Sequence, residues 1–189
     1  MSKSLLPRAL SLVIAASILT ACAEEPAPEA PTEATEATEA TETTAISADA
    51  LPQVERGTME ECPYLDTQFV AETNGQRMVD YGVDERFETP ACVFWSYPDL
   101  PQATVMVREM NSFDQAMDVV DFAAPIDSTS PAEFGVWQGG RGPVTGGPSQ
   151  GGSVYAVAKD STAVVVWSNQ KQSVKAETLA HAVIENLGL

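Results

Sequence analysis

Thr162-Ala163-Val164-Val165-Val166-Trp167 is the stretch of the sequence that decides the fold. A strand formed here is apolar on both faces, so it is expected to lie in the centre of a sheet. The run from Ser153 to Ala158 is also extended, and Lys159-Asp160-Ser161 joins the two runs. We therefore predict a hairpin of residues 153–158 and 162–168 whose second strand is central.

The chain after this hairpin predicts a helix. Ser173 is its expected cap and Gly188 its expected stop signal, and the apolar positions between them fall on one face. These positions are Ala176, Leu179, Ala180, Val183, Ile184 and Leu187. A continuous apolar stripe of this kind is typical of a helix that packs one side against a core.

The chain before the hairpin predicts a helix followed by three strands. Asp66 has the residue type of a helix cap and Gly75 that of a helix stop, which predicts a helix over 67–74. The extended runs that follow cover residues 77–83, 91–97 and 103–110. In the third run, Val105 and Val107 share one face, and the other face carries Thr104, Met106 and Arg108.

A capping box opens a further helix. Ser112-x-x-Gln115 has the form of this motif. The apolar positions of the helix recur at helical spacing and are Phe113, Met117, Val120 and Ala124. The order of helix, three strands, helix, long loop, hairpin and helix predicts an α+β domain, with an antiparallel sheet packed by helices.

The first residues of the chain have the pattern of an export signal. Lys3 and Arg8 precede an apolar run, which Leu19-Thr20-Ala21-Cys22 closes in a form that resembles the lipobox of bacterial lipoproteins. The run is shorter than the ~20 residues of a membrane-spanning helix. The resemblance implies that residues 1–21 are a lipoprotein signal peptide. It also implies that Cys22 carries a lipid anchor at the extracytoplasmic face of the cell membrane. A plain signal peptide with a free Cys22 is the alternative.

The segment from residue 22 to residue 50 has the composition of a disordered linker. It is rich in Thr, Glu, Ala and Pro, contains no Lys or Arg, and has almost nothing large to bury. The following residues, 51–189, are enough for a single globular domain. The whole chain has 27 acidic and 10 basic residues, a net charge of −17 at pH 7. This charge argues against binding to nucleic acid and against direct adhesion to anionic lipid head groups.

Cys62 and Cys92 are expected to form a disulfide. An isolated pair in an exported domain is most simply explained in this way. A zinc site or a thioredoxin-like redox motif has little support, because the sequence has one histidine and no C-x-x-C pair. We therefore expect neither a metal nor a cofactor.

Eight of the 12 glycines fall between Gly135 and Gly152, which predicts a long loop without structure of its own. Trp137 and Arg141 lie in this loop and offer an aromatic face and a cation suited to a sugar, a peptide or an anionic head group. They are the candidate binding residues, with packing of Trp137 against the sheet edge as the alternative. Three further aromatic residues are expected to pack in the core or on a sheet face: Trp95, Tyr97 and Trp167.

Gly147-Pro148-Ser149-Gln150-Gly151 satisfies the G-x-S-x-G pattern, and Asp160 and His181 follow in the order found in α/β-hydrolases. A nucleophile elbow requires a strand before the serine and a helix after it, whereas here a glycine-rich loop precedes and a strand follows. His181 lies on the last helix outside its apolar stripe, where a solvated position is expected. We therefore expect no catalytic residue and no enzyme activity. Hydrolysis by Ser149 and His181 is kept as the alternative.

Short motifs along the domain carry a family resemblance. They are Cys62-Pro63-Tyr64-Leu65, Asp84-Glu85-Arg86-Phe87, Pro90-Ala91-Cys92-Val93-Phe94-Trp95, Ala124-Pro125-Ile126-Asp127-Ser128 and Ser168-Asn169-Gln170. Over residues 61–189 the chain resembles uncharacterised corynebacterial (actinobacterial) envelope lipoproteins, a family without an assigned activity. It is more distantly similar to actinobacterial lipoproteins with a PsbP-like fold, which implies a sheet backed by helices and nothing about function.

These observations lead to the hypothesis of a non-catalytic binding or accessory role in the cell envelope. The domain is expected to act as a monomer on its tether and to bind a partner protein, a wall polymer or an envelope lipid. A purely structural spacer is a further alternative. An enclosed apolar cavity would favour a lipid ligand, and an exposed apolar patch would favour a protein partner.

Overall fold

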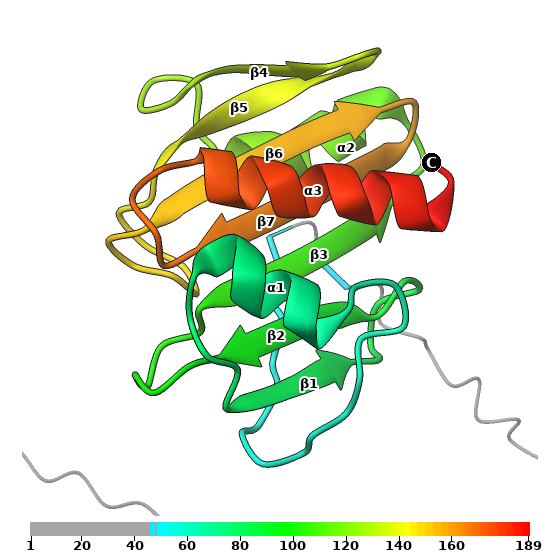
Figure 1. Ribbon diagram of the computed structural model, residues 1–189. Helices are drawn as coiled ribbons and strands as arrows, with labels where there is room; N and C mark the ends of the chain where they lie inside the picture. The colour runs from blue at the N-terminus through cyan, green and yellow to red at the C-terminus, as the bar shows by residue number, and fades with distance from the viewer. Residues whose placement is uncertain (1–45, 48) are drawn as a thin grey trace, which may run out of the picture. The chain divides into compact units, whose positions relative to one another are not determined.

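The computed structural model describes residues 46, 47 and 49–189, which form one sheet and three helices (Figure 1). The strands are β1 (Asp80–Asp84), β2 (Ala91–Trp95), β3 (Ala103–Glu109), β4 (Ser130–Phe134), β5 (Trp137–Pro143), β6 (Ser153–Lys159) and β7 (Thr162–Ser168). The helices are α1 (Thr67–Asn74), α2 (Phe113–Ala123) and α3 (Val174–Leu187). The predicted signal peptide, Cys22 and the linker as far as residue 45 lie outside the described residues.

The strands form an antiparallel sheet in the order β1-β2-β3-β7-β6-β5-β4. β7 lies in the middle, between β3 and β6, so the prediction of a central strand is confirmed. The hairpin is confirmed as well, because β6 and β7 pair from Ser153 opposite Ser168 to Lys159 opposite Thr162. The predicted class, α+β with an antiparallel sheet packed by helices, is the class observed.

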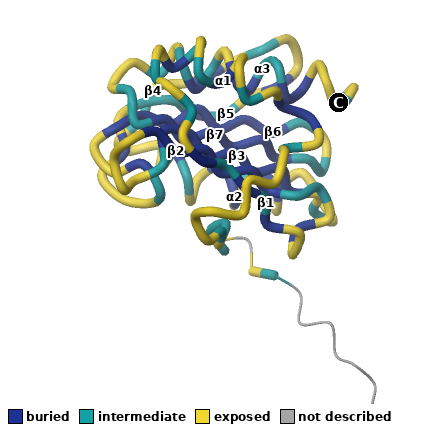
Figure 2. The backbone as a smooth tube through the Cα atoms, turned by 60° about the horizontal axis from the view of Figure 1, so that its bottom comes forward, coloured by how far each residue is buried: buried dark blue, intermediate teal, exposed yellow. Residues whose placement is uncertain are grey.

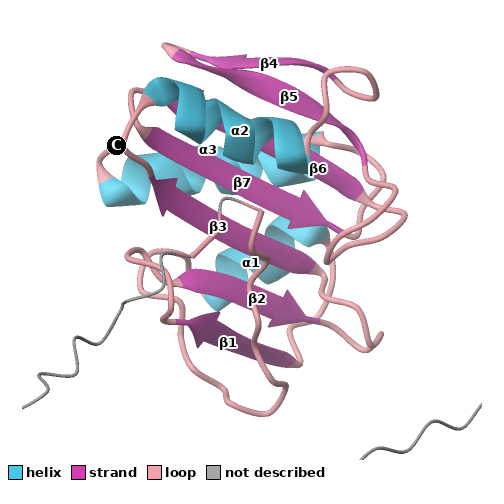
Figure 3. Ribbon diagram, turned by 180° about the vertical axis from the view of Figure 1, so that it is seen from behind, coloured by secondary structure: helices cyan, strands magenta, loops and turns pink. Residues whose placement is uncertain are grey.

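Both faces of β7 are buried, because successive side chains of a strand point to opposite faces. Val164 and Val166 join a core shared with α1 and α3, whereas Ala163, Val165 and Trp167 join a second core shared with α2. Figures 1 and 3 show α1 and α3 on one face of the sheet and α2 on the other. In Figure 2 the central strands accordingly appear as a buried layer.

α2 covers only part of its face of the sheet. It packs mainly on β5, β6 and β7. The chain that precedes α1 crosses the rest of this face, over β1, β2 and β3 (Figure 3). One half of this face is thus covered by a helix and the other half by an irregular segment.

The first and last helices agree with the prediction except at one cap. Asp66 caps α1 as expected, since its Oδ1 accepts a hydrogen bond from the backbone N–H of Phe69 at 2.9 Å. α3 ends at Gly188 and buries Ala176, Leu179, Ala180, Val183 and Ile184. Ser173 is not the predicted side-chain cap. Its backbone is already helical, and its hydroxyl makes no capping bond within the described residues.

The capping box of α2 is half formed. Oγ of Ser112 accepts a hydrogen bond from the N–H of Gln115 at 3.3 Å, but the Gln115 side chain accepts from Asn111 and not from Ser112. The residues that α2 buries are Ala116, Val119 and Val120. The predicted apolar stripe is wrong at Phe113, which is 37% exposed. The face of α2 that packs on the sheet is centred on the three buried residues, and Phe113 lies outside it.

The predicted loop of residues 135–152 is wrong for its first half. Residues 137–143 form β5, which pairs with β4 on one side and β6 on the other. The sequence predicts neither strand, because glycine and proline are depleted in strands. A Cβ atom at Gly139 would lie 2.9 Å from Cα of Val157, so glycine lets β5 and β6 approach here. Residues 144–152 remain a loop.

The predicted disulfide between Cys62 and Cys92 is present, with their Cα atoms 5.7 Å apart. It joins the segment before α1 to β2, across a sequence separation of 30 residues. Cys92 is buried in the core shared with α1 and α3. The bond therefore ties the approach to α1 to the sheet.

Candidate functional site

The chain before α1 lies on the sheet as a strap, defined as residues 46, 47 and 49–58. Carboxylates at the two ends of β1 bind its backbone. Asp84 is 4% exposed, and its Oδ2 accepts a hydrogen bond from the N–H of Gln53 at 2.8 Å. Asp80 is 7% exposed, and its Oδ2 accepts a hydrogen bond from the N–H of Gly57 at 2.6 Å. The strap is therefore attached to the edge strand of the sheet at two points.

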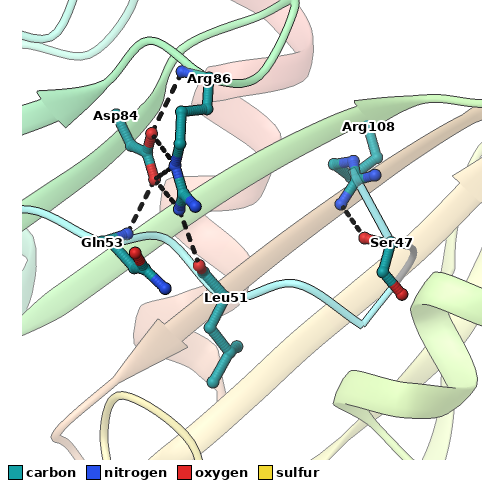
Figure 4. Close-up of polar contacts among 6 residues, drawn as sticks. All are labelled: Ser47, Leu51, Gln53, Asp84, Arg86 and Arg108. Atoms are coloured by element: carbon teal, nitrogen blue, oxygen red, sulfur yellow. Dashed lines mark hydrogen bonds and ion pairs between the residues drawn. The ribbon is translucent and has the colours of Figure 1, made fainter. Parts of the chain in front are cut away.

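Arg86 strengthens the first of these attachments (Figure 4). Its Nε and Nη2 donate to the Asp84 carboxylate at 2.9 and 2.5 Å, and Nη2 also donates to the carbonyl of Leu51 at 3.3 Å. Burial by itself would raise the pKa of Asp84. The hydrogen bonds from Arg86 and from the N–H of Gln53 outweigh burial and hold that pKa below its ordinary value. Asp84 is therefore an ionised acceptor at neutral pH.

Arg108 of β3 holds the first residues of the strap (Figure 4). It is 7% exposed, and its Nη1 and Nη2 donate to the carbonyls of Ser47 and Ile46, each at 3.0 Å. Its guanidinium lies 4.9 Å from the centroid of the Phe87 ring, and burial lowers the pKa of Arg108. Residues 46 and 47, which the sequence analysis places in the linker, therefore lie against the domain.

Arg56 joins the strap to the loop between β2 and β3. Its Nη2 donates to the carbonyl of Ser96 and its Nη1 to the carbonyl of Pro98, each at 3.2 Å. Its Nε lies 3.7 Å from Oδ2 of Asp80. The strap, the edge strand and this loop are thus connected by one set of polar contacts.

A pocket of about 500 Å³ lies between the strap and the sheet, and we call it the strap pocket. Its volume is in the range of small-molecule sites, roughly 300–1,000 Å³. The lining residues come from the strap, from β2 and β3, and from two loops: Leu51, Pro52, Val54, Val93, Trp95, Leu100, Pro101, Thr104, Gly147 and Pro148. None of these residues, within the part of the chain that the structure describes, carries a charge. The pocket is therefore suited to an apolar ligand.

Thr104 supplies the polar side chain of this lining. It is 1% exposed, and among the described residues its Oγ1 has no hydrogen-bond partner. A buried hydroxyl without a partner costs ~1–3 kcal/mol in proteins. Because Oγ1 is itself covered, a ligand oxygen reaches it only if neighbouring side chains move aside. The hydrogen bond then formed would recover part of this free energy and would orient the ligand.

Two exposed apolar side chains lie in the loop between β2 and β3. Leu100 lines the strap pocket and is 50% exposed, and Tyr97 is 69% exposed. The prediction that Tyr97 packs in the core or on the sheet is wrong, because β2 ends at Trp95 and Tyr97 belongs to the loop. Trp95 and Trp167 are 4% and 2% exposed, so the prediction is confirmed for them.

The candidate binding residues of the glycine-rich segment lie away from this pocket, on β5. Trp137 is 4% exposed in the core shared with α1 and α3, and Nζ of Lys159 lies 5.7 Å from its ring centroid. Arg141 donates through Nη1 to Oε2 of Glu177 on α3 at 2.8 Å. The ring of Trp137 is therefore packed on the sheet, which is the alternative named above, and Arg141 already has a partner.

Ser149 and His181 are not hydrogen-bonded to each other in the described structure. Ser149 is fully buried, and its Oγ has no hydrogen-bond partner among the described residues. The His181 ring stacks on Phe134 of β4 with centroids 3.8 Å apart, and its Nε2 lies 3.3 Å from Oη of Tyr155. His181 is half-buried, so the expected solvated position holds only in part, because the sequence does not predict the strand that carries Phe134. Burial, followed by the charge of Glu177, raises the pKa of Tyr155 to about 12.

Within residues 46, 47 and 49–189, no group of three or more His, Cys, Asp or Glu side chains is placed to hold a metal ion. Over these residues, no helix combines the length and hydrophobicity needed to cross a bilayer. The strap pocket is therefore the feature on which a function can be argued.

A family model described as a domain of unknown function (DUF2020) matches residues 46–189. The chain belongs to this family. The match agrees with the resemblance to an uncharacterised family, and it begins at Ile46, where the described strap begins. The domain of the family therefore includes the strap as well as the sheet and the helices. No curated protein shows significant similarity to the chain.

Neither the strap nor Thr104 is predicted from the sequence as part of a site. A signal for the strap was present in Asp84 and Arg86, two opposite charges at the end of an expected strand. Their further partners are backbone atoms of Gln53 and Leu51, which no side-chain pattern reveals. For Thr104, nothing in the sequence distinguishes it from any other threonine of a strand.

Proposed function

We propose that this protein is a lipid-anchored module of the cell envelope that binds an apolar ligand in the strap pocket and catalyses no reaction. The observation that carries the proposal is an apolar pocket of about 500 Å³ with one buried, unpartnered hydroxyl. Apolar walls favour binding because they remove hydrocarbon surface from water. A single polar group then fixes the orientation of the ligand.

The chemistry of the lining supports binding rather than catalysis. General acid–base or nucleophilic catalysis requires a carboxylate, imidazole, thiol, amine or activated hydroxyl at the reacting atoms. The described residues that line the strap pocket offer the hydroxyl of Thr104 without a base beside it. Ser149 and His181, the alternative hydrolase pair, have separate surroundings.

The location of the protein is the second part of the proposal. Two sequence features support it: the lipobox pattern that ends at Cys22 and the acidic linker that follows. The resemblance to corynebacterial envelope lipoproteins supports it as well, and so does the more distant similarity to actinobacterial lipoproteins with a PsbP-like fold. The composition of residues 22–50 predicts a linker, which as a flexible coil would reach roughly 30 Å. The domain would then work as a monomer close to the outer face of the membrane. A partner protein or a wall polymer is the competing kind of ligand.

Nile red, an uncharged dye that fluoresces in apolar surroundings, provides the first test. The mature chain is produced with Cys22→Ala, so that its own lipid cannot bind the dye. Pro148→Trp narrows the strap pocket and is expected to weaken dye binding at least tenfold, ~1.4 kcal/mol. Val174→Trp adds the same side chain at a 54% exposed site on α3 and is expected to leave binding unchanged.

Equal dye affinity in Pro148→Trp and Val174→Trp would refute the pocket as the binding site. Absence of dye binding together with capture of a wall polymer or an envelope protein would favour the competing ligands. Fractionation of cells tests the location. The Cys22→Ala protein is expected in the medium or as unprocessed precursor, and recovery of mature-size protein in membranes would contradict the lipid anchor.

A further inference from the structure

A second, smaller hollow adjoins the strap pocket. Its volume is about 240 Å³, and the end of α2, the loop after β5 and Trp167 line it. Leu51 and Gly147 line both hollows, so the two lie side by side with Leu51 at their boundary. The lining of the smaller hollow also contains no charged residue in the described part of the chain.

We infer that the two hollows together hold the hydrocarbon chain of one uncharged lipid, and that Leu51 sets how far this chain extends. The inference rests on the proposed function and names its ligand class. An elongated ligand fits the site better than a compact one, because the two hollows lie side by side along Leu51 and Gly147 and do not form one round cavity. Leu51 belongs to the strap and is half-buried, whereas Trp95 and Trp167 are buried walls fixed in strands.

The charges of the site favour an uncharged head group. A carboxylate or phosphate placed against the lining would lose its hydration and meet no charged group among the described lining residues, which is unfavourable. The guanidinium of Arg56 lies 5.8 Å from the centroid of the Trp95 ring, but it already binds the carbonyls of Ser96 and Pro98. The net charge of −17 on the chain also repels an anionic lipid. The hydroxyl of Thr104 can instead donate to an ester carbonyl or accept from an alcohol, both of which are uncharged.

The loop between β2 and β3 gives such a ligand a route into the pocket. Leu100 is 50% exposed where it lines the pocket, and Tyr97 is 69% exposed in the same loop. Arg56 holds this loop through the carbonyls of Ser96 and Pro98. Exposed apolar side chains beside an apolar pocket are typical of a surface that contacts apolar material. A hydrocarbon chain can therefore pass from a lipid aggregate into the strap pocket along these side chains, with little of its apolar surface exposed to water.

The test uses the mature Cys22→Ala chain and straight-chain methyl esters, from octanoate to palmitate, that compete with Nile red. In the wild-type pocket, affinity is expected to rise about fourfold with each added methylene, which corresponds to ~0.8 kcal/mol per buried CH₂. In Leu51→Trp the rise is expected to stop at a shorter ester, because the larger side chain closes the boundary. Ala123→Phe narrows the smaller hollow from α2 and is expected to give the same early plateau. Val174→Trp is the control.

Each outcome decides a separate point. If affinity stops rising at the same ester length in the wild-type protein, in Leu51→Trp and in Ala123→Phe, the two-hollow inference is overturned. Binding of Nile red in that case would still support the proposed function. Palmitate ion that competes as well as methyl palmitate would overturn the uncharged head group. Failure of every ester to displace the dye would overturn the lipid class. Failure of Nile red itself to bind would overturn the proposed function.

Discussion

The substitution Thr104→Val tests whether the buried Thr104 hydroxyl lowers the free energy of unfolding while it contributes to ligand binding in the strap pocket. Thr104 is 1% exposed, and its Oγ1 has no hydrogen-bond partner among the described residues. Valine has nearly the same shape and removes the hydroxyl. Because an unpartnered buried hydroxyl costs ~1–3 kcal/mol, the variant is expected to be more stable than the parent by about 1 kcal/mol.

Ser168→Ala is the matched control, since Ser168 is also fully buried in the sheet but has partners. Its Oγ donates to Oδ1 of Asn74 at 2.9 Å and accepts from the N–H of Gln170 at 3.1 Å. Removing this hydroxyl leaves buried polar groups unsatisfied, which costs ~1–3 kcal/mol. The two hydroxyl deletions are therefore expected to change the free energy of unfolding in opposite directions.

Urea unfolding of the oxidised protein, followed by tryptophan fluorescence, measures both changes. For a domain of this size, 1 kcal/mol corresponds to a shift of roughly 2–4 °C in Tm, so thermal unfolding provides a second measurement. Thr104→Val is also expected to bind methyl esters about fivefold more weakly, the loss of one hydrogen bond of ~1 kcal/mol. Destabilisation of Thr104→Val by as much as Ser168→Ala would refute the reasoning, because it would mean that the Thr104 hydroxyl is already satisfied.

Other predictions concern the strap, the disulfide and β5. Asp84→Ala is expected to destabilise the protein by ~1–2 kcal/mol and to speed hydrogen exchange at the N–H of Gln53, which loses its acceptor. The folded pKa of Asp84 is lower than its unfolded value of ~3.9. The stabilisation from the ionised carboxylate is therefore complete above pH ~3.9 and is lost as the pH falls through the folded pKa. Acid unfolding of the parent protein should contain a step that Asp84→Asn lacks. The double change Cys62→Ala, Cys92→Ala is expected to cost ~3.6 kcal/mol in the loop-entropy treatment, measured by urea unfolding. Gly139→Ala is expected to cost ~1–3 kcal/mol in the same assay, because its Cβ would press on the backbone of β6.

Neighbouring positions supply controls for these variants. Glu85 is exposed next to Asp84, and Glu85→Ala should leave the exchange of Gln53 unchanged. A Cβ atom at Gly146 would meet nothing within 4 Å, so Gly146→Ala should cost far less than Gly139→Ala. Slow exchange at Gln53 in Asp84→Ala would contradict the assigned hydrogen bond. Equal stability of the two alanine-for-glycine variants would contradict the close approach of β5 and β6.

The sequence was most informative where a local pattern and the final environment coincide. The apolar run that forms β7 indicates burial on both faces, and β7 is the central strand. The stripe on the last helix predicts the face that packs on the sheet, and five of its six positions are buried. The alternation in β3 places Thr104 and Arg108 on one face, which is the face that the strap crosses.

Patterns failed where a residue took its environment from a distant part of the chain. β5 is a strand because β6 offers it an edge, and β4 is a strand because β5 does so in turn, although the glycines of β5 and the prolines of both strands favour a loop. Trp137 belongs to β5 and is buried in the core, and His181 stacks on Phe134 of β4, so neither environment is predicted when these strands are not. A sequence pattern measures local preference, whereas these positions are decided by pairing across the sheet.

The sequence by itself determined the central hairpin, the packing face of the last helix and the cysteine pair, and it contains the lipobox pattern from which the anchor is proposed. Only the tertiary structure decided that the strap belongs to the domain and encloses a pocket. The hydrogen bonds that place it join Asp84 to Gln53 and Asp80 to Gly57, 31 and 23 residues apart in the chain. These bonds are made to backbone N–H groups, which every residue except proline has, so no residue type marks them before the chain folds.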